Sequence, residues 1–313
     1  MKKNSPFQYV LHAAVVVGMV VAGTKYINGD EFTRAIKQFN WLYAPFIMSL
    51  SLMYVGVKAW RFAYMLRELA DTSRSMVMRS YFAAQACTLL PGGIAARAAI
   101  LEQAGVPVTK SAAAIAISSM SDQIVLIGCS IVAALWFPSA RQPVFFLLGG
   151  LAALSIILGI EASRTWLIHA VKKILGKWKL SGYVDKFLVS LREIATVPVL
   201  LAGIGNSLLA AIFMILALDL SLRGVGADVP YFRLLLAFTL PSLMGRISAL
   251  PGGVGVIEAG MVGILDASPG IRLDQAAAAV AIFRVGTLLF AALVGGLVYW
   301  LGWHGAAEKK AAH

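Results

Sequence analysis

The sequence predicts an all-α, polytopic integral membrane helical bundle. Of its 313 residues, 59% are hydrophobic and only 13% are charged, and the mean hydropathy is +0.80. A water-soluble domain would carry about 25% charged residues. Apolar blocks of about 20 residues recur along the chain, which is the length that crosses a hydrocarbon layer of ~30 Å. These observations exclude a soluble enzyme, a disulfide scaffold and a disordered chain.

Six uncharged blocks are predicted to be full spans. They cover about 9–24, 41–57, 111–136, 143–160, 196–222 and 274–302. The first block has no convincing signal-peptide cleavage site before Lys25, and further spans follow it. We therefore interpret it as a retained first helix.

Two further stretches are interrupted by a Pro-Gly-Gly sequence and are predicted to be re-entrant helical hairpins. The piece 76–90 would rise only ~22 Å as a helix, too little for a straight crossing. Proline and glycine end the helix there and supply permissive backbone. The hairpins are expected over 76–110 and 231–273, with their breaks buried in protein or facing water. The residues that form the breaks are Pro91, Gly92, Gly93, Pro251, Gly252, Gly253 and Gly255.

The distribution of Lys and Arg orients this arrangement. With the N-terminus and the C-terminus in the cytoplasm, seventeen Lys and Arg fall in cytoplasmic segments and six in outer ones. That bias follows the positive-inside rule and predicts a multi-pass protein of a bacterial-type inner membrane. In this count Lys58 and Arg61 are placed in a cytoplasmic segment after the span 41–57. The net charge of +12 therefore sets topology, and we expect no nucleic-acid partner.

The chain contains an internal repeat within a single domain, 1–313. The sequence Leu-Pro-Gly-Gly at 90–93 recurs at 250–253, and an alanine run follows each copy at the head of the next span. Repeat 1, about 41–136, would open its hairpin to the cytoplasm, and repeat 2, about 196–302, would open outward. This is an inverted-topology repeat, which places a substrate site near the midplane. Between the repeats, 161–195 is predicted to be an amphipathic cytoplasmic connector on anionic headgroups, or a plain basic connector.

Five charged residues lie inside otherwise apolar segments, where an unpaired charge costs between ~2.5 and more than 10 kcal/mol. They are Arg97, Asp122, Arg246, Glu258 and Arg284. The signs are exchanged between the repeats, so Arg97 is expected with Asp122 and Glu258 with Arg284. Two interpretations stay open. The charges form an ion-pair network that pins the hairpins, or the arginines hold a phosphate by bidentate hydrogen bonds while the acids orient it.

No metal or cofactor is expected. His12 and His169 have no second ligand at helical spacing, and no His-Glu-x-x-His sequence occurs. Neither a phosphate-binding Walker loop nor a dinucleotide-binding sequence is found. The serines around Asp122 have no paired histidine and are expected to pack helices.

The string Leu250-Pro251-Gly252-Gly253-Val254-Gly255-Val256-Ile257-Glu258 resembles the membrane region of lysylphosphatidylglycerol synthases, the flippase-like domain family. The resemblance covers about 5–305 and assigns Glu258 to the motif glutamate. In that family the first motif usually reads Pro-x-x-Gly-Glu-x-x-Arg. Here residues 91–97 lack the acid, and the spacing to Arg97 is shifted. The resemblance implies re-entrant hairpins. One member of the family, the multiple peptide resistance factor, moves aminoacylated phosphatidylglycerol between leaflets, and other members occur beside hopanoid and lipid-sugar enzymes. The resemblance implies a role of one of these kinds.

Three functions are compatible with these features. The first is translocation or binding of an anionic lipid or a lipid-linked sugar between leaflets. The second is a non-transporting accessory role beside a separate lipid-modifying enzyme, for example for hopanoids or glycolipids. The third is an intramembrane enzyme acting on a lipid phosphate, which would need an activated nucleophile that the sequence does not show. We expect no catalytic residues, and no lysyl transfer without a soluble transferase domain. The oligomeric state is left open.

Overall fold

The computed structural model describes residues 29–88, 93–137, 181–248 and 250–303, and also 141–142, 145–146, 149–150, 165–166 and 169. Every element among these residues is a helix. The predicted span 9–24, nearly all of 143–160, Pro91 and Gly92, and most of 161–180 lie outside the described residues.

Four helical segments run the length of the bundle, and each is long and apolar enough to cross a membrane. They are α3 (Ala44–Arg67) with the preceding η1 turn (Trp41–Tyr43), α6 (Val108–Trp136), α10 (Val197–Gly224), and the continuous run of α13 (Leu273–Arg284), η4 (Val285–Leu289), α14 (Phe290–Val298) and η5 (Tyr299–Trp303). They match the predicted spans 41–57, 111–136, 196–222 and 274–302. Proline residues lie at the start of several of them, where the missing backbone N–H is tolerated.

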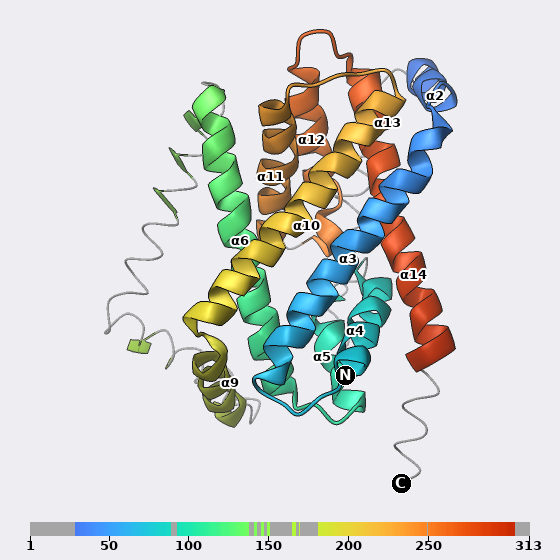
Figure 1. The fold of residues 1–313 in the computed structure, drawn as a ribbon. Helices are drawn as coiled ribbons and strands as arrows, with labels where there is room; N and C mark the ends of the chain where they lie inside the picture. The colour runs from blue at the N-terminus through green and yellow to red at the C-terminus, as the bar shows by residue number, and fades with distance from the viewer. Residues whose placement is uncertain are drawn as a thin grey trace, which may run out of the picture.

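Shorter helices occupy the two ends of the bundle (Figure 1). At one end lie α4 (Arg74–Ala83) and α5 (Gly93–Gln103), and the η2 turn (Ala84–Cys87) follows α4 toward the middle of the bundle. At the opposite end lie α11 (Tyr231–Ile247) and α12 (Val256–Asp266), joined through the η3 turn (Pro251–Gly253) near the middle, and α2 (Gly29–Lys37) lies beside α13. The amphipathic helix α9 (Ser181–Ile194) lies at the same end as α4 and α5 and covers the second half of the predicted connector.

The backbone of the second Pro-Gly-Gly sequence is not helical. Gly252, Gly253 and Gly255 have φ angles of 60°, 64° and 89°, a region that side-chain-bearing residues rarely adopt. At the first Pro-Gly-Gly sequence, a Cβ on Gly93 would collide with the Cys87 carbonyl oxygen. Both breaks therefore depend on glycine, one because of its dihedral angles and the other because of close backbone packing.

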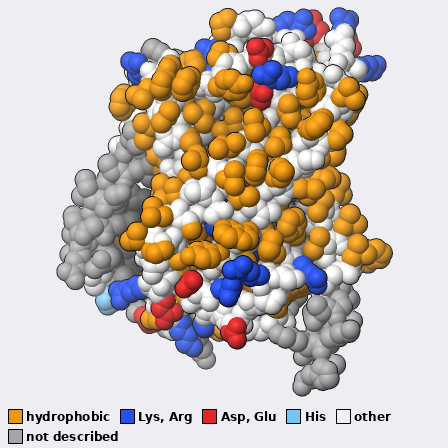
Figure 2. All heavy atoms as spheres, in the orientation of Figure 1, with side chains coloured by type: hydrophobic (Ala, Val, Ile, Leu, Met, Phe, Trp, Pro, Cys, Tyr) orange, Lys and Arg blue, Asp and Glu red, His pale blue; other side chains and the backbone are white. Residues whose placement is uncertain are grey.

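The outer surface is apolar where a soluble protein would be polar. Large hydrophobic side chains point outward along the long helices, among them Leu201, Leu216, Ile124, Leu135 and Leu293. Figure 2 shows hydrophobic side chains over most of the visible face between the two ends, with Lys, Arg, Asp and Glu gathered toward both ends. Such a belt is the surface that contacts the hydrocarbon layer of a bilayer.

The interior contains polar groups as well as a hydrophobic core. The largest core cluster joins α3, α6, α10, α11, α12 and α13, and a second joins α3, α4, α6 and α10. Ser121 and Ser221 each donate their hydroxyl hydrogen to the carbonyl four residues earlier in their own helix. Ser130 of α6 donates to Thr239 of α11 at 3.0 Å. These small residues satisfy their own polar groups and allow close helix packing.

Candidate functional site

A cavity of 510 Å³ lies between the long helices and the two breaks. It is lined by side chains from α3, α6, α10, α11, α13 and η4, and by Thr88, Gly93, Gly252 and Gly253. A Cβ on Gly252 would lie 3.7 Å from the Thr88 carbonyl oxygen, so the second break packs against the turn that precedes the first. The volume is within the range of small-molecule sites, roughly 300–1,000 Å³.

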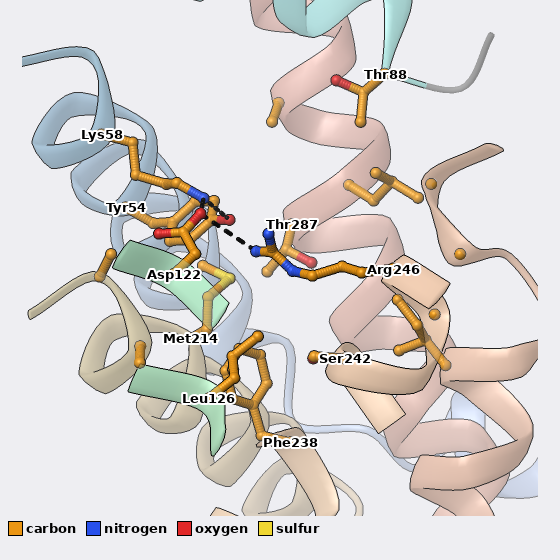
Figure 3. Close-up of a pocket in the computed structure, with 18 of the residues that line it drawn as sticks. Tyr54, Lys58, Thr88, Asp122, Leu126, Met214, Phe238, Ser242, Arg246 and Thr287 are labelled. Atoms are coloured by element: carbon orange, nitrogen blue, oxygen red, sulfur yellow. Dashed lines mark hydrogen bonds and ion pairs between the residues drawn. The ribbon is translucent and has the colours of Figure 1, made fainter. Parts of the chain in front are cut away.

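Asp122, on α6, is surrounded by three cations from two other helices, of which Figure 3 shows Lys58 and Arg246. Its Oδ2 atom lies 2.7 Å from Lys58 Nζ and 3.3 Å from Arg246 Nη2, and its Oδ1 atom lies 2.8 Å from Arg61 Nη1. The Ser207 hydroxyl donates to Oδ1 at 2.9 Å. One carboxylate therefore neutralises one of three nearby positive charges.

Arg61 is the innermost of these cations. Its side chain is fully buried, and Nη2 donates to the Ser118 hydroxyl at 2.6 Å while Nη1 also donates to Ser207. Its Nε atom is buried without a hydrogen-bond partner among the described residues. A buried guanidinium needs a fixed set of acceptors, and here Asp122 and two serines from α6 and α10 supply them.

Lys58 and Arg61 correct the sequence prediction, which ended the span 41–57 before them and counted both as cytoplasmic. The helix continues to Arg67, and both side chains are buried in it. When these two residues are left out of the count, the cytoplasmic segments still contain more Lys and Arg than the outer ones, so the predicted orientation is unchanged. A usable signal was present: Tyr54, Lys58 and Arg61 share one helical face, and the apolar run resumes at Phe62. Lys58 also donates to the Tyr54 hydroxyl at 3.0 Å.

Arg246 reaches Asp122 from α11, just before the second break. About a third of its side chain, 32%, is exposed, compared with 10% for Lys58 and none for Arg61. Figure 3 shows Arg246 extended toward Asp122 from the side opposite Lys58. Its contact is the longest of the three and its side chain is the most accessible, so it is the cation that can leave Asp122 most easily.

Arg284 and Glu258 form a second polar cluster at the Pro-Gly-Gly-Val-Gly break. Arg284 Nε forms an ion pair with Glu258 Oε1, and its Nη2 donates to the Gly252 carbonyl oxygen at 3.0 Å. The other Glu258 oxygen accepts the Gly255 backbone N–H at the start of α12. Glu258 thus pairs with Arg284, as we expected from the opposite order of the charges in the two repeats. These contacts link α13 to the break.

Arg97 does not contact Asp122, contrary to the expected pairing. Its guanidinium lies 4.2 Å from the centre of the Tyr81 ring, and it lines the cavity. Within the described part of the chain no ion pair with a carboxylate is found for it. The first Pro-Gly-Gly sequence lacks the glutamate that the family motif has at this place. Arg97 therefore has no neighbouring motif carboxylate and lies on the face of an aromatic ring.

Four cations and one carboxylate line the cavity among the described residues. The cations are Lys58, Arg97, Arg246 and Arg284, and the carboxylate is Asp122. In a site of low dielectric constant such an excess attracts an anion strongly. The described residues contain no group of three His, Cys, Asp or Glu side chains that could hold a metal ion.

A comparison with known protein families matches residues 9–295 to the family described as the lysylphosphatidylglycerol synthase TM region. The chain belongs to this family. No curated protein sequence matches the chain. Membership in the lysylphosphatidylglycerol synthase TM family, together with the four long apolar helices, makes this chain a membrane protein.

Proposed function

We propose that this member of the lysylphosphatidylglycerol synthase TM family binds an anionic lipid or lipid-linked headgroup in the central cavity and moves it between leaflets. The observation that carries the proposal is the excess of cations over carboxylates in a 510 Å³ cavity. Arginine and lysine recognise phosphate by charge-assisted hydrogen bonds, which are strong where water is excluded.

We further propose that the chain is an inverted repeat with two re-entrant hairpins. The arrangement of helices supports this, because α3 and α6 flank the α4–α5 pair at one end, while α10 and α13 flank the α11–α12 pair at the other (Figure 1). The packing of Gly252 against Thr88 brings the two breaks together at the cavity. Inverted repeats of this kind place their substrate between broken helices and alternate access to the two sides.

The proposed setting is a bacterial-type inner membrane with cytoplasmic termini, and the partners are membrane lipids, with a separate lipid-modifying enzyme as a further candidate. Binding and movement are proposed in place of catalysis. The cavity lining among the described residues includes serines but no histidine to activate them.

An accessory, non-transporting role is the second candidate, and the Glu258–Arg284 pair is the observation that favours it. Each Glu258 oxygen already has a partner within the protein, so this cluster can act purely as a clamp on the break. The two roles predict different effects of substituting Glu258 or Arg284. If the pair only holds the break in place, a substitution lowers the stability of the protein, whereas if the pair belongs to a transport site, it slows lipid movement.

The test is a leaflet-resolved lipid transport assay in reconstituted vesicles with Glu258→Gln and Arg284→Gln. Glutamine keeps an acceptor for the Gly255 N–H but removes the charge. A charge-assisted hydrogen bond contributes ~1.5–3 kcal/mol, so transport of a labelled anionic lipid is expected to slow by about tenfold or more. Glu102→Gln, at an exposed position of α5, and Arg233→Gln, at the outer end of α11, are the matched controls. Wild-type transport rates in both Glu258→Gln and Arg284→Gln would refute the transport proposal.

A further inference from the structure

We infer that Gln123, Ser242 and Ser119 form hydrogen bonds with hydroxyl groups of the headgroup that the cavity binds. The cavity then prefers a phosphate lipid whose headgroup is a polyol, glycerol or a sugar-like ring, over one whose headgroup has no hydroxyl. The inference rests on the proposed lipid-binding function and deepens it, because it names the residues that distinguish one anionic headgroup from another.

These three uncharged side chains line the cavity and make no side-chain hydrogen bond within the described part of the chain. Ser119 and Gln123 belong to α6, and Ser242 belongs to α11. The other serines and threonines that line the cavity each donate or accept a hydrogen bond; they are Ser51, Thr88, Ser118, Ser207 and Thr287. The three side chains therefore differ from the polar groups around them in having free hydrogen-bonding capacity.

The Gln123 amide shows most clearly that a partner is missing. Its Oε1 atom is buried and accepts no hydrogen bond from the described residues, although the residue lines the cavity. Most buried side-chain oxygens in folded proteins have a partner, because an unpaired one loses the hydrogen bonds that it made to water. The terminal torsion of a glutamine side chain is broad, so a rotation can turn this oxygen toward a donor in the cavity. A ligand hydroxyl is such a donor, and it can also accept from the amide nitrogen.

Two contacts between α6 and α11 place Gln123 close to the site of the arginine. Arg246 Nη2 lies 3.3 Å from Asp122 Oδ2, and Ser130 donates to Thr239 at 3.0 Å. The later residue of α6 thus contacts the earlier residue of α11, so the two helices run antiparallel here. Gln123 lies between the two contacts along α6. It is one residue, about 1.5 Å along the helix axis, from the aspartate that Arg246 contacts.

Ser242 and Ser119 extend this polar surface by one helical turn on each helix. Ser242 precedes Arg246 by four residues on α11, and Ser119 precedes Gln123 by four residues on α6, so each pair shares a helical face. Figure 3 shows Ser242 on the same side of the cavity as Arg246. A phosphate bound by Arg246 therefore has uncharged groups next to it. Lysine and arginine offer only donors, whereas the serines and the glutamine can also accept a hydrogen bond from a hydroxyl group.

The experiment is a competition measurement on the full-length protein in nanodiscs of phosphatidylcholine. The probe is phosphatidylglycerol with a fluorescent acyl chain, and the competitors are unlabelled phosphatidylglycerol, phosphatidylinositol and phosphatidylpropanol. All of them carry one phosphodiester charge, but the propanol headgroup has the carbon chain of glycerol without its free hydroxyl groups. We expect phosphatidylpropanol to compete at least about tenfold more weakly than phosphatidylglycerol, because it leaves the groups that bind hydroxyls unpaired.

Gln123→Leu should abolish this preference, because it weakens phosphatidylglycerol binding by about tenfold and leaves phosphatidylpropanol binding unchanged. Ser242→Ala should reduce the preference by a smaller factor. Neither side chain is bonded to the described residues, so both variants should unfold at the wild-type temperature. Gln103→Leu, which removes the acceptor of the Trp303 indole N–H, and Ser130→Ala are the matched controls outside the cavity and should keep the preference.

The possible outcomes separate this inference from the proposed function. Equal competition by phosphatidylglycerol and phosphatidylpropanol would overturn hydroxyl recognition while leaving lipid binding intact. A preference that persists in Gln123→Leu, or that is lost together with thermal stability, would overturn the role of Gln123. Absence of saturable probe binding would overturn the proposed function itself. Stronger competition by phosphatidylinositol than by phosphatidylglycerol would support a sugar-like headgroup, and the reverse order would support glycerol.

Discussion

Replacing Asp122 by Asn is the most direct test of the charge arrangement. The substitution keeps the shape and one acceptor oxygen, but it leaves Lys58, Arg61 and Arg246 without the carboxylate that holds them. Two of these cations are buried, and Arg61 has no exposed surface. Removal of one partner from a buried ion cluster costs about 3–5 kcal/mol, because the charges left behind cannot reach water.

A Coulomb estimate gives a larger gross attraction, from which the cost of desolvating the charges has still to be subtracted. Opposite charges ~4 Å apart attract by about 4 kcal/mol at an effective dielectric constant near 20. Asp122 makes two contacts shorter than this, with Lys58 and Arg61. Part of the loss is recovered because the accessible Arg246 can move into the cavity. We therefore expect the free energy of unfolding to fall by about 3–5 kcal/mol, which would show as a shifted midpoint in equilibrium unfolding in mixed micelles.

Asp219→Asn is the matched control for this measurement. Asp219 is as buried as Asp122, with 7% and 8% of the residue exposed, and it also lies on a long helix. Its partner Arg223 has 42% of its side chain exposed and can be solvated when released, so the loss should be much smaller. A second variant, Asp122→Asn with Lys58→Met, removes one stranded cation and should be more stable than Asp122→Asn alone. Equal losses for Asp122→Asn and Asp219→Asn, or a further loss in the double variant, would refute the reasoning.

Two further predictions concern the backbone and the topology. Gly253→Val should lower the thermal stability or the yield of folded protein, because Gly253 has a φ of 64° and a Cβ there would lie 2.6 Å from Ile257 Cδ1. Gly149→Val, where a Cβ would meet nothing within 4 Å, should be mild, and equal tolerance at the two positions would count against a structured break. Single cysteines in α9 should react with a membrane-impermeant reagent only from the cytoplasm, and one at Arg272 only from outside. Labelling of both sites from the same side would rule out the inverted topology.

The transport proposal and the stability prediction address different parts of the polar interior. Asp122 and Arg61 hold α3, α6 and α10 together, so their removal is expected to affect folding first. Arg246 and Arg97 face the cavity with spare donors, so their removal is expected to affect ligand binding first. We therefore expect Asp122 and Arg61 to belong to a structural ion-pair network, and Arg246 and Arg97 to belong to the proposed anion site.

The boundary of the predicted span 41–57 illustrates why the candidate site was only partly predicted. A span drawn from hydropathy ends at the first charge, so Lys58 and Arg61 were placed outside the membrane. Their partners on other helices lie 57 to 146 positions away in the sequence, and no local pattern connects residues so far apart. Arg97 was expected to meet Asp122 by symmetry, but α3 and α11 supply the cations instead.

The amino-acid sequence by itself determined the membrane class, four of the long helices, the two Pro-Gly-Gly breaks and the presence of buried charge. These features follow from local causes, namely the length of apolar runs, the missing N–H of proline and the absence of a glycine side chain. Only the tertiary structure decided which cations Asp122 holds, which arginine keeps free donors, and that Gly252 packs against Thr88. The physical reason is that a buried charge takes as its partner whichever opposite charge the packing of helices brings within ~4 Å, and that packing is a property of the whole bundle.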